Sequence, residues 1–232
     1  MYAPAAWGIH RIVRCRQCSL TRTEPQPERD ALLASYGGQR RTARAVDTVR
    51  HAFARVFAAR VVRGLGAGGR MLDIGCGDGV VLASLAARGF TCIGTELPGR
   101  YPQRPATPGI TIVEATDVAD LHLASGSCRL VVARHALEHL RDPAAVLREA
   151  RRVLDPSGRL VVAVPNLASW QSRRAGAAWF HLDVPRHLVH FTPATLQALV
   201  RDAGFTIERT TQLSFEHGPY GWLQSLRNMA GG

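Results

Sequence analysis

Three glycines alternate with other residues in the segment Gly75-Cys-Gly-Asp-Gly79, which follows a short apolar run containing the carboxylate Asp73. The rhythm is G-x-G-x-G and not the G-x-G-x-x-G of dinucleotide-binding proteins, because Val80 occupies the third glycine position of that motif. A helix pattern begins at Val80. Glycines between a strand and a helix let the backbone approach a ligand closely, since no side chain intervenes. The segment therefore predicts a ligand-binding turn.

A second carboxylate, Glu96, ends the apolar run Phe90–Thr95, one strand–helix–strand unit after Asp73. A carboxylate in that position can accept hydrogen bonds from both hydroxyls of a ribose. An ordinary acid at a strand end is the alternative. The combination of Glu96 with Asp73 and the glycines favours the ribose interpretation.

Histidines and aromatic residues gather between residues 178 and 191, and another histidine follows the apolar run Leu130–Ala133. Histidine titrates near neutral pH, so it can take a proton from a hydroxyl or an amine during a reaction. Imidazoles that only hold a loop by hydrogen bonds are the alternative. The candidate catalytic bases are His139, His181, His187 and His190.

The elements that must position these residues alternate between strand and helix patterns. This alternation predicts an α/β fold with a doubly wound, mostly parallel sheet and three layers, αβα. After the run that precedes Gly75, the predicted strands are Phe90–Thr95, Ile110–Val113, Leu130–Ala133, Arg159–Val164 and Phe205–Thr210. The predicted helices are Thr42–Arg63, Val80–Arg88, Pro143–Leu154, Pro193–Ala203 and Trp222–Leu226. In such a sheet, the connections at the carboxyl ends of the strands line the ligand site.

The chain divides into an irregular lead-in, residues 1–40, and one domain, residues 41–232, with an acceptor-site insert at about 165–191. The lead-in carries a single C-x-x-C, at Cys15 and Cys18, which supplies only two of the four ligands of a structural zinc site. The last twenty residues offer a polar loop and a helix in place of a further strand. We therefore expect the domain to be truncated at its C-terminal end.

The composition is that of a globular protein with a basic surface. All 29 basic residues are arginine, against 18 acidic residues, for a net charge of +11. A basic surface can attract nucleic acid or anionic molecules, and a solvated arginine-rich surface is the alternative that we favour. There is no signal-peptide pattern and no run of transmembrane length. Five cysteines, an odd number, do not form a disulfide framework, so we expect a cytoplasmic protein.

Three segments carry a family resemblance. Asp73–Gly79 resembles motif I of the class I S-adenosylmethionine-dependent methyltransferases, and Leu137-Glu-His139 before Asp-Pro resembles their post-strand segment. Asp-Val-Pro-Arg-His at 183–187, with His-Phe-Thr at 190–192, resembles the Methyltransf_23 group of bacterial methyltransferases. The resemblance implies a Rossmann-like class I fold with S-adenosyl-L-methionine as cofactor, lying across the first two strand ends.

The resemblance also implies the cofactor contacts. Asp117 matches the acid that meets the adenine amino group, and the backbone amide of Val118 matches the group at a ring nitrogen. The implied cofactor-binding residues are Asp73, Gly75, Cys76, Gly77, Gly79, Glu96, Leu97, Asp117, Val118, Arg134 and His135.

The same resemblance raises the question of a metal. In some quinone-pathway O-methyltransferases, two glutamates and a histidine bind a divalent ion at the positions of His135, Glu138 and His139. His135 departs from that pattern, and polar groups at a helix start account for Glu138 and His139. We therefore expect no metal site in this chain.

Methyl transfer requires the acceptor atom in line with the bond from the methyl carbon to sulfur, and orientation lowers the barrier. Methylation of base amines usually needs an Asn/Asp-Pro-Pro-aromatic motif, where this chain has Arg134-His-Ala-Leu137. Cytosine chemistry needs a cysteine there, which is also missing. We therefore expect a small-molecule, glycan or lipid-linked acceptor, methylated at oxygen. The alternatives are an RNA methyltransferase and a non-catalytic S-adenosylmethionine-binding regulatory module.

Overall fold

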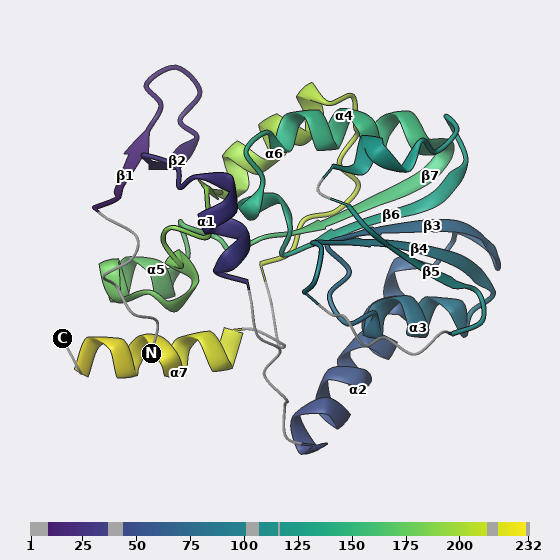
Figure 1. The fold of residues 1–232 in the computed structure, drawn as a ribbon, viewed down its shortest axis with the longest axis horizontal. Coiled ribbons are helices and arrows are strands. Elements are labelled where there is room, and N and C mark those ends of the chain that lie inside the picture. The colour runs from purple at the N-terminus through teal and green to yellow at the C-terminus, as the bar shows by residue number, and fades with distance from the viewer. Residues whose placement is uncertain (1–8, 37–43, 101–106, 116, 213–217, 231–232) are drawn as a thin grey trace. The chain divides into compact units, whose positions relative to one another are not determined.

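The computed structural model describes residues 9–36, 44–100, 107–115, 117–212 and 218–230 (Figure 1). The chain forms two compact units. The first, which we call the parallel-sheet unit, consists of residues 36–136 and 145–163. The second, which we call the histidine unit, consists of residues 1–35, 137–144 and 164–232.

Five parallel strands form the centre of the parallel-sheet unit. They are β3 (Gly69–Ile74), β4 (Phe90–Glu96), β5 (Ile110–Glu114), β6 (Cys128–Arg134) and β7 (Leu154–Ala163). Their order is β5-β4-β3-β6-β7, so the chain moves outward from β3 first on one side and then on the other. This is the predicted doubly wound sheet, and the strand order reverses beside β3.

Helices cover both faces of this sheet. Helices α2 (Arg44–Val61) and α3 (Val80–Ala86) lie on one face, and α4 (Pro143–Val153) lies on the other (Figure 1). A short 3-10 helix, η2 (Val118–Leu121), follows β5. No described helix combines the length and the apolar character that crossing a bilayer requires.

The core of the unit lies between β3, β6 and the helices. Met71, Leu82, Leu85 and Leu130 are fully buried there, as expected for strands covered on both faces. Packing requires glycine at position 94 on β4, because a Cβ atom there would lie 2.6 Å from Cys76 Sγ. The missing side chain lets the glycine-rich turn after β3 pack directly against β4.

The histidine unit contains a small antiparallel sheet in the order β1-β2-β8. Its strands are β1 (Arg11–Arg14), β2 (Thr21–Glu24) and β8 (Val189–His190). Its helices are α1 (Arg29–Ala34), η3 (Leu137–His139), α5 (Trp170–Ala175), η4 (Gly176–Ala178), η5 (Phe180–Leu182), α6 (Pro193–Asp202) and α7 (Gly218–Ala230). Helix α6 begins as predicted, with Thr192 and Thr195 forming a reciprocal cap.

Two predictions from the sequence are wrong. Residues 11–34 are not irregular, because they form the β1-β2 hairpin and helix α1. Phe205–Thr210 is not a strand, since it pairs with no other strand among the described residues. An alternating pattern becomes a strand only when a neighbouring backbone takes up its hydrogen bonds. Residues 97–100 and 107–109 form turns and no helix, and residues 101–106 lie outside the described residues.

Candidate functional site

The glycine-rich turn follows β3 at the edge of the sheet where the strand order reverses. Gly75, Gly77 and Gly79 have φ angles of 71°, 61° and 84°, in the left-handed region that favours glycine. A Cβ atom on Gly75 would also lie 3.1 Å from the Ala136 side chain. The turn therefore needs glycine for both conformation and space. Open sheets of this type bind ligands at such a reversal point.

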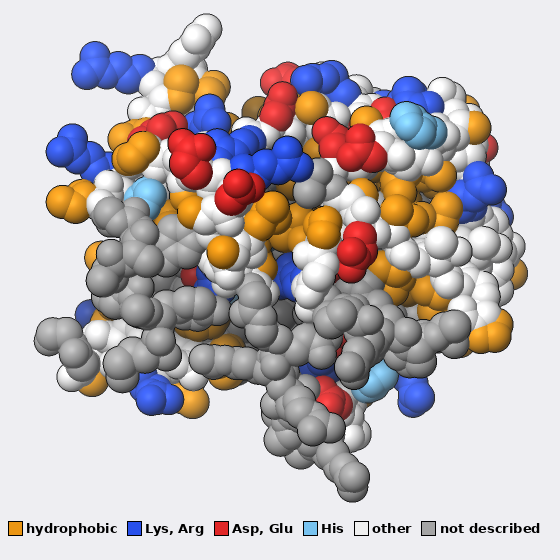
Figure 2. Space-filling model, in the orientation of Figure 1, with side chains coloured by type: hydrophobic (Ala, Val, Ile, Leu, Met, Phe, Trp, Pro, Cys, Tyr) orange, Lys and Arg blue, Asp and Glu red, His pale blue; other side chains and the backbone are white. Residues whose placement is uncertain are grey.

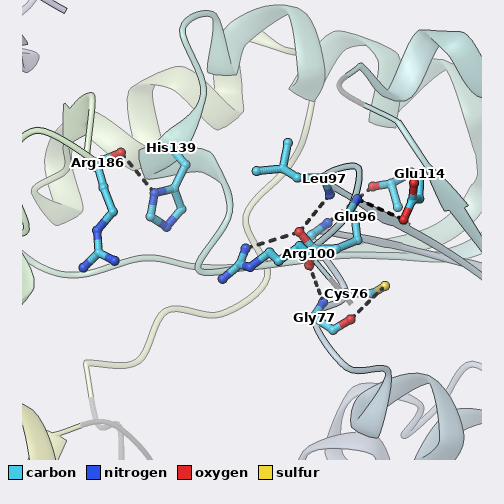
Figure 3. Close-up of polar contacts among 11 residues, drawn as sticks. Cys76, Gly77, Glu96, Leu97, Arg100, Glu114, His139 and Arg186 are labelled. Atoms are coloured by element: carbon cyan, nitrogen blue, oxygen red, sulfur yellow. Dashed lines mark hydrogen bonds and ion pairs between the residues drawn. The ribbon is translucent and has the colours of Figure 1, made fainter. Parts of the chain in front are cut away.

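Glu96 holds this turn against the end of β4 (Figure 3). Its Oε2 atom accepts a hydrogen bond from the Gly77 amide at 2.8 Å. Its Oε1 atom accepts from the Leu97 amide at 2.9 Å and from Arg100 Nη1 at 3.2 Å. A carboxylate has about four lone-pair sites, so three donors leave room for one more on Oε2. We predicted bonds to both ribose hydroxyls, and the second bond requires Arg100 to move.

Asp73 lies at the end of β3 and is buried, with 3% of its surface exposed. Burial raises the pKa of Asp73 to about 7, and the charge of Glu96 acts in the same direction, while Arg134 lowers this pKa. Near neutral pH, the Asp73 carboxyl group is therefore present in both protonation states. It can donate or accept a hydrogen bond at the turn.

The remaining predicted cofactor residues also belong to the parallel-sheet unit. The Arg134 guanidinium lies over the Phe57 ring, 4.4 Å from its centroid. The His135 amide donates to the Ala163 carbonyl at 2.8 Å. Asp117 accepts a hydrogen bond from the Ala119 amide at 3.0 Å and so begins η2, in which Val118 is buried.

Two arginines at the turn were not predicted as site residues. Arg50 on α2 forms a 2.6 Å ion pair with Asp78. Arg100 reaches back to Glu96 from the turn that follows β4. Neither residue belongs to a local motif. Only the folded arrangement reveals these contacts.

The histidine unit brings the candidate bases together. A narrow pocket is lined by Glu138, Pro165, Leu167, Trp179, His181, His187, Val189 and His190. The fourth candidate, His139, joins this group because its ring centroid lies 4.6 Å from that of His187. All four predicted histidines therefore belong to one cluster.

Backbone carbonyl groups determine which ring nitrogens carry hydrogen. His139 Nδ1 lies 3.1 Å from the Arg186 carbonyl oxygen, as Figure 3 shows. His187 Nδ1 lies 2.9 Å from the His181 carbonyl oxygen. A carbonyl oxygen only accepts, so both Nδ1 atoms donate. In the neutral rings of His139 and His187, the lone pair is therefore on Nε2.

Thr23, on the N-terminal hairpin, gives His190 the opposite tautomer. The buried Thr23 hydroxyl donates to the His187 carbonyl at 2.7 Å and lies 2.9 Å from His190 Nε2. A hydroxyl has one hydrogen, so His190 Nε2 must be the donor in the second bond. The sequence contained no signal for Thr23, because β2 pairs with β8 across most of the chain.

Burial keeps two of these rings neutral. It lowers the pKa of His187 to about 4, and the neighbouring His139 acts in the same direction, while Glu138, Asp183 and the His181 carbonyl oppose the shift. Burial also lowers the pKa of His190 to about 4, with Glu138 opposing. Neutral imidazoles can accept a proton, but rings with so low a pKa are weak bases. His139 and His181 are the half-buried members of the cluster.

Asp183 and Arg186 support the cluster from the same loop. Arg186 Nη2 lies 2.5 Å from Asp183 Oδ1, and the His187 amide donates to the Asp183 carbonyl at 3.0 Å. Asp183 Oδ2 lies 3.8 Å from His187 Nε2. The Asp-Val-Pro-Arg-His motif thus forms a closed turn that presents His187.

The C-x-x-C of the lead-in lies apart from these groups, at the tip of the β1-β2 hairpin. Cys15 and Cys18 are both exposed. Amides of Cys18 and Gln17 lower the pKa of Cys15. Among the described residues, no histidine, cysteine or acidic side chain joins this pair as a third metal ligand.

Comparisons with known proteins agree with the turn and the sheet. The family model described as a methyltransferase domain matches residues 39–210. The chain is also 30% identical over 162 residues to a ubiquinone biosynthesis O-methyltransferase of Xanthomonas oryzae, a match covering 65% of this chain and 68% of that protein. The protein of the same description from Cereibacter sphaeroides is 29% identical over 172 residues, which cover 69% of this chain and 70% of that protein.

Solved structures share the fold. A methyltransferase from Thermotoga maritima, described as a possible histamine N-methyltransferase, is 25% identical with a TM-score of 0.52, covering 68% of this chain and 73% of its own. Phosphoethanolamine N-methyltransferase 2 from Haemonchus contortus, solved with S-adenosyl-L-methionine, is 16% identical with a TM-score of 0.55. That match covers 76% of this chain and 42% of the other.

This chain belongs to the methyltransferase domain family. It is an enzyme of the class I type, with a Rossmann-like parallel sheet, and S-adenosyl-L-methionine is its cofactor. The predictions of family, fold, enzyme class and cofactor are confirmed.

Proposed function

We propose that this enzyme transfers a methyl group from S-adenosylmethionine to a hydroxyl oxygen of a small-molecule, glycan or lipid-linked acceptor. The observation that carries the proposal is the likeness to ubiquinone biosynthesis O-methyltransferases over about two thirds of the chain. The free cysteine thiols support a reducing, cytoplasmic setting.

The parallel-sheet unit holds the cofactor in this proposal. The glycine turn would lie against the methionine part of the cofactor, since glycines admit close approach of a ligand to the backbone. Glu96 would bind a ribose hydroxyl through the open acceptor site on Oε2. The segment at Asp117 and Val118 would contact the adenine. The cofactor contacts of the eleven residues predicted from the sequence remain predictions.

The histidine unit handles the acceptor. In the reaction, the acceptor oxygen forms a bond to the methyl carbon while the carbon–sulfur bond breaks, giving a methyl ether and S-adenosylhomocysteine. The hydroxyl proton must leave the oxygen. The cluster of His139, His181, His187 and His190 provides imidazole nitrogen atoms beside a buried carboxylate, Glu138. His187 and His190 are neutral but weakly basic, so neither performs this step as an ordinary base.

The charges on the face that Figure 2 shows give little support to the RNA alternative. Basic side chains on the visible face lie among acidic and hydrophobic ones and do not gather into one stripe (Figure 2). Binding to a nucleic-acid backbone typically uses a continuous basic surface.

The test is transfer of tritiated methyl groups from the cofactor into hydroxyl-bearing and amine-bearing acceptors, with separate glycan, lipid and RNA pools. We expect label in alkali-stable ethers of a phenolic, sugar or lipid-linked hydroxyl compound. The His187→Ala variant should lower turnover while its affinity for S-adenosylhomocysteine stays within about threefold of the wild type. Label that enters RNA, or cofactor binding without transfer to any pool, would refute the proposal.

A further inference from the structure

We propose that the indole N–H of Trp179 is a specificity-determining hydrogen-bond donor of the pocket in the histidine unit, and that it selects acceptors carrying an uncharged carbonyl or ether oxygen. Trp179 lines this pocket and is only 4% exposed. Its Nε1 atom is buried and has no hydrogen-bond partner among the described residues. The indole nitrogen can only donate, so the group that completes this bond must be an acceptor atom.

A buried indole N–H without a partner is unusual, because this group normally finds an acceptor when it is buried. An unpaired, desolvated donor carries a free-energy penalty, and a ligand that supplies an acceptor removes it. A ligand of the same shape without an acceptor leaves the penalty in place. A site built around such a donor therefore discriminates between ligands by their chemistry, and less by their size.

Helix α7 fixes the backbone on both sides of Trp179. The Phe180 amide donates to Ser225 Oγ at 2.9 Å, and Asn228 Nδ2 donates to the Ala178 carbonyl at 3.1 Å. Ser225 is fully buried. A ring held in this way is positioned before any ligand arrives, so the donor loses little entropy when it forms its bond.

The neighbouring His181 ring does not replace the missing acceptor. The rings of Trp179 and His181 meet edge-on, with their centroids 5.7 Å apart. Contacts of an N–H group with an aromatic ring are much weaker than a hydrogen bond to oxygen. Gly221 of α7 packs against the other side of this contact, because a Cβ atom on it would collide with the His181 ring. Both rings are therefore held as one wall of the pocket.

The other lining residues indicate which acceptor atom fits. The apolar part of the lining includes Pro165, Leu167 and Val189. Glu138 lines the same pocket and is 1% exposed, so an anionic ligand group would meet a buried carboxylate. His187 and His190 are neutral near pH 7 and do not offset that charge. Carboxylates and phosphates are therefore disfavoured, and an uncharged oxygen is favoured.

The selection of methyl acceptors rests on the proposed function, because it requires that this pocket receives the acceptor. The hydrogen bond itself does not depend on that function, since the binding of a probe molecule is measured without cofactor or methyl transfer.

The experiment follows the indole N–H resonances of the full chain, labelled with nitrogen-15, during titration with three phenols of similar shape. 4-Hydroxyacetophenone presents a carbonyl oxygen, 4-ethylphenol presents no acceptor at that position, and 4-hydroxybenzoate presents a carboxylate. The chain has four tryptophans, and Trp179→Phe assigns the Trp179 signal by removing it. We expect the ketone, and not 4-ethylphenol, to move this proton resonance downfield, as formation of a hydrogen bond does.

Affinities of the variants measure the contribution of the donor. Trp179→Phe keeps an aromatic ring and should weaken binding of the ketone about 10-fold, while 4-ethylphenol changes less than about twofold. Trp170→Phe is the matched control, because Trp170 lies in the same unit and is 60% exposed. It should leave both affinities unchanged. In the wild type, 4-hydroxybenzoate should bind about 10-fold more weakly than the ketone.

Thermal melting shows whether each variant is folded. Equal losses for the ketone and 4-ethylphenol in folded Trp179→Phe would overturn the proposal, because ring volume alone would explain them. So would a Trp179 resonance that stays unchanged throughout the titration with the ketone. Tighter binding of 4-hydroxybenzoate than of the ketone would overturn the selection of an uncharged oxygen.

The test does not depend on the folding of one variant. If Trp179→Phe does not fold, phenylalanine at each of the other three tryptophans assigns the Trp179 resonance by elimination, and its shift in the wild type decides. If this resonance shifts but no acceptor is methylated, the proposed function fails and the donor stands. If an acceptor is methylated while the resonance does not respond to the ketone, the donor fails and the proposed function stands.

Discussion

Replacing Glu96 tests how one carboxylate serves both the fold and the cofactor. In Glu96→Ala, the amides of Gly77 and Leu97 lose their acceptor. A buried donor left without a partner costs about 1–3 kcal/mol. The Arg100 contact adds less, because the Arg100 side chain is 34% exposed and solvent screens it. We expect the free energy of unfolding to fall by about 2–4 kcal/mol.

Cofactor affinity should fall as well. The glycine turn loses its support, and one hydrogen bond from a ribose hydroxyl to a charged acceptor is lost, which is worth about 1.5–3 kcal/mol. Together with loosening of the turn, about 2–4 kcal/mol corresponds to a 30- to 1000-fold weaker dissociation constant for S-adenosylhomocysteine. In Glu96→Gln, the side-chain NH2 group replaces one of the two carboxylate oxygens and therefore faces a backbone N–H donor, which it cannot accept from. This variant should also lose stability.

The assays are urea denaturation and calorimetric titration with S-adenosylhomocysteine. Glu114→Ala is the matched control, because Glu114 pairs with Glu96 in register at the end of the next strand but is exposed. Its one hydrogen bond, from the exposed Gly99 amide, is open to water, so the variant should change stability by less than about 1 kcal/mol. Unchanged stability of Glu96→Ala would refute the role of Glu96 in holding the glycine-rich turn against β4. An unchanged dissociation constant in folded protein would remove Glu96 from the cofactor site.

The remaining predictions concern the buried polar groups. Thr23→Val should lower the free energy of unfolding by about 1–3 kcal/mol, because the His187 carbonyl and the His190 ring lose a partner, whereas Thr23→Ser should stay close to the wild type in urea denaturation. Burial raises the pKa of Asp73 from 3.8 to about 7, so the folded state holds an extra proton in this range and stability is lost as pH rises toward 7. Asp73→Asn should remove that part of the slope in unfolding experiments at a series of pH values. Burial lowers the pKa of His187 and His190 from 6.5 to about 4, so their contribution is present above pH 6.5 and lost as pH falls toward 4. His190→Gln should reduce this acid sensitivity, and an unchanged profile would contradict the assigned burial effect.

The parallel sheet and its glycine turn could be predicted because their signals are local. Apolar runs, a carboxylate and left-handed glycines lie within a few residues of one another around Asp73. The strand that ends at Glu96 could be predicted as well, because it lies one strand–helix–strand unit after Asp73. The helix start at Pro193 is also local, since its cap involves residues three apart.

The rest depends on contacts between distant segments. Strand β2 has only four residues, and its pairing of Thr21 with His190 spans most of the chain, so no periodic pattern announces it. The prediction of a strand at 205–210 was wrong for the opposite reason. The local alternation of apolar and polar residues is present, but no described strand pairs with this segment. Likewise, the closeness of His187 to Glu138 comes from the folded loop and has no counterpart in sequence spacing.

The hydroxyl of Thr23 has a consequence for how this enzyme and its relatives diverge. Thr23 lies before residue 39, where the match to the family model begins. The tautomer of His190 is therefore set by a hairpin outside the region that defines the family. Two relatives with the same histidines but different leading segments would therefore differ in which ring nitrogens of the histidine cluster donate hydrogen bonds and which accept them. Exchange of that hairpin would therefore alter the hydrogen bonding of the histidine cluster, while the glycine-rich turn, which lies within the matched region, stays the same.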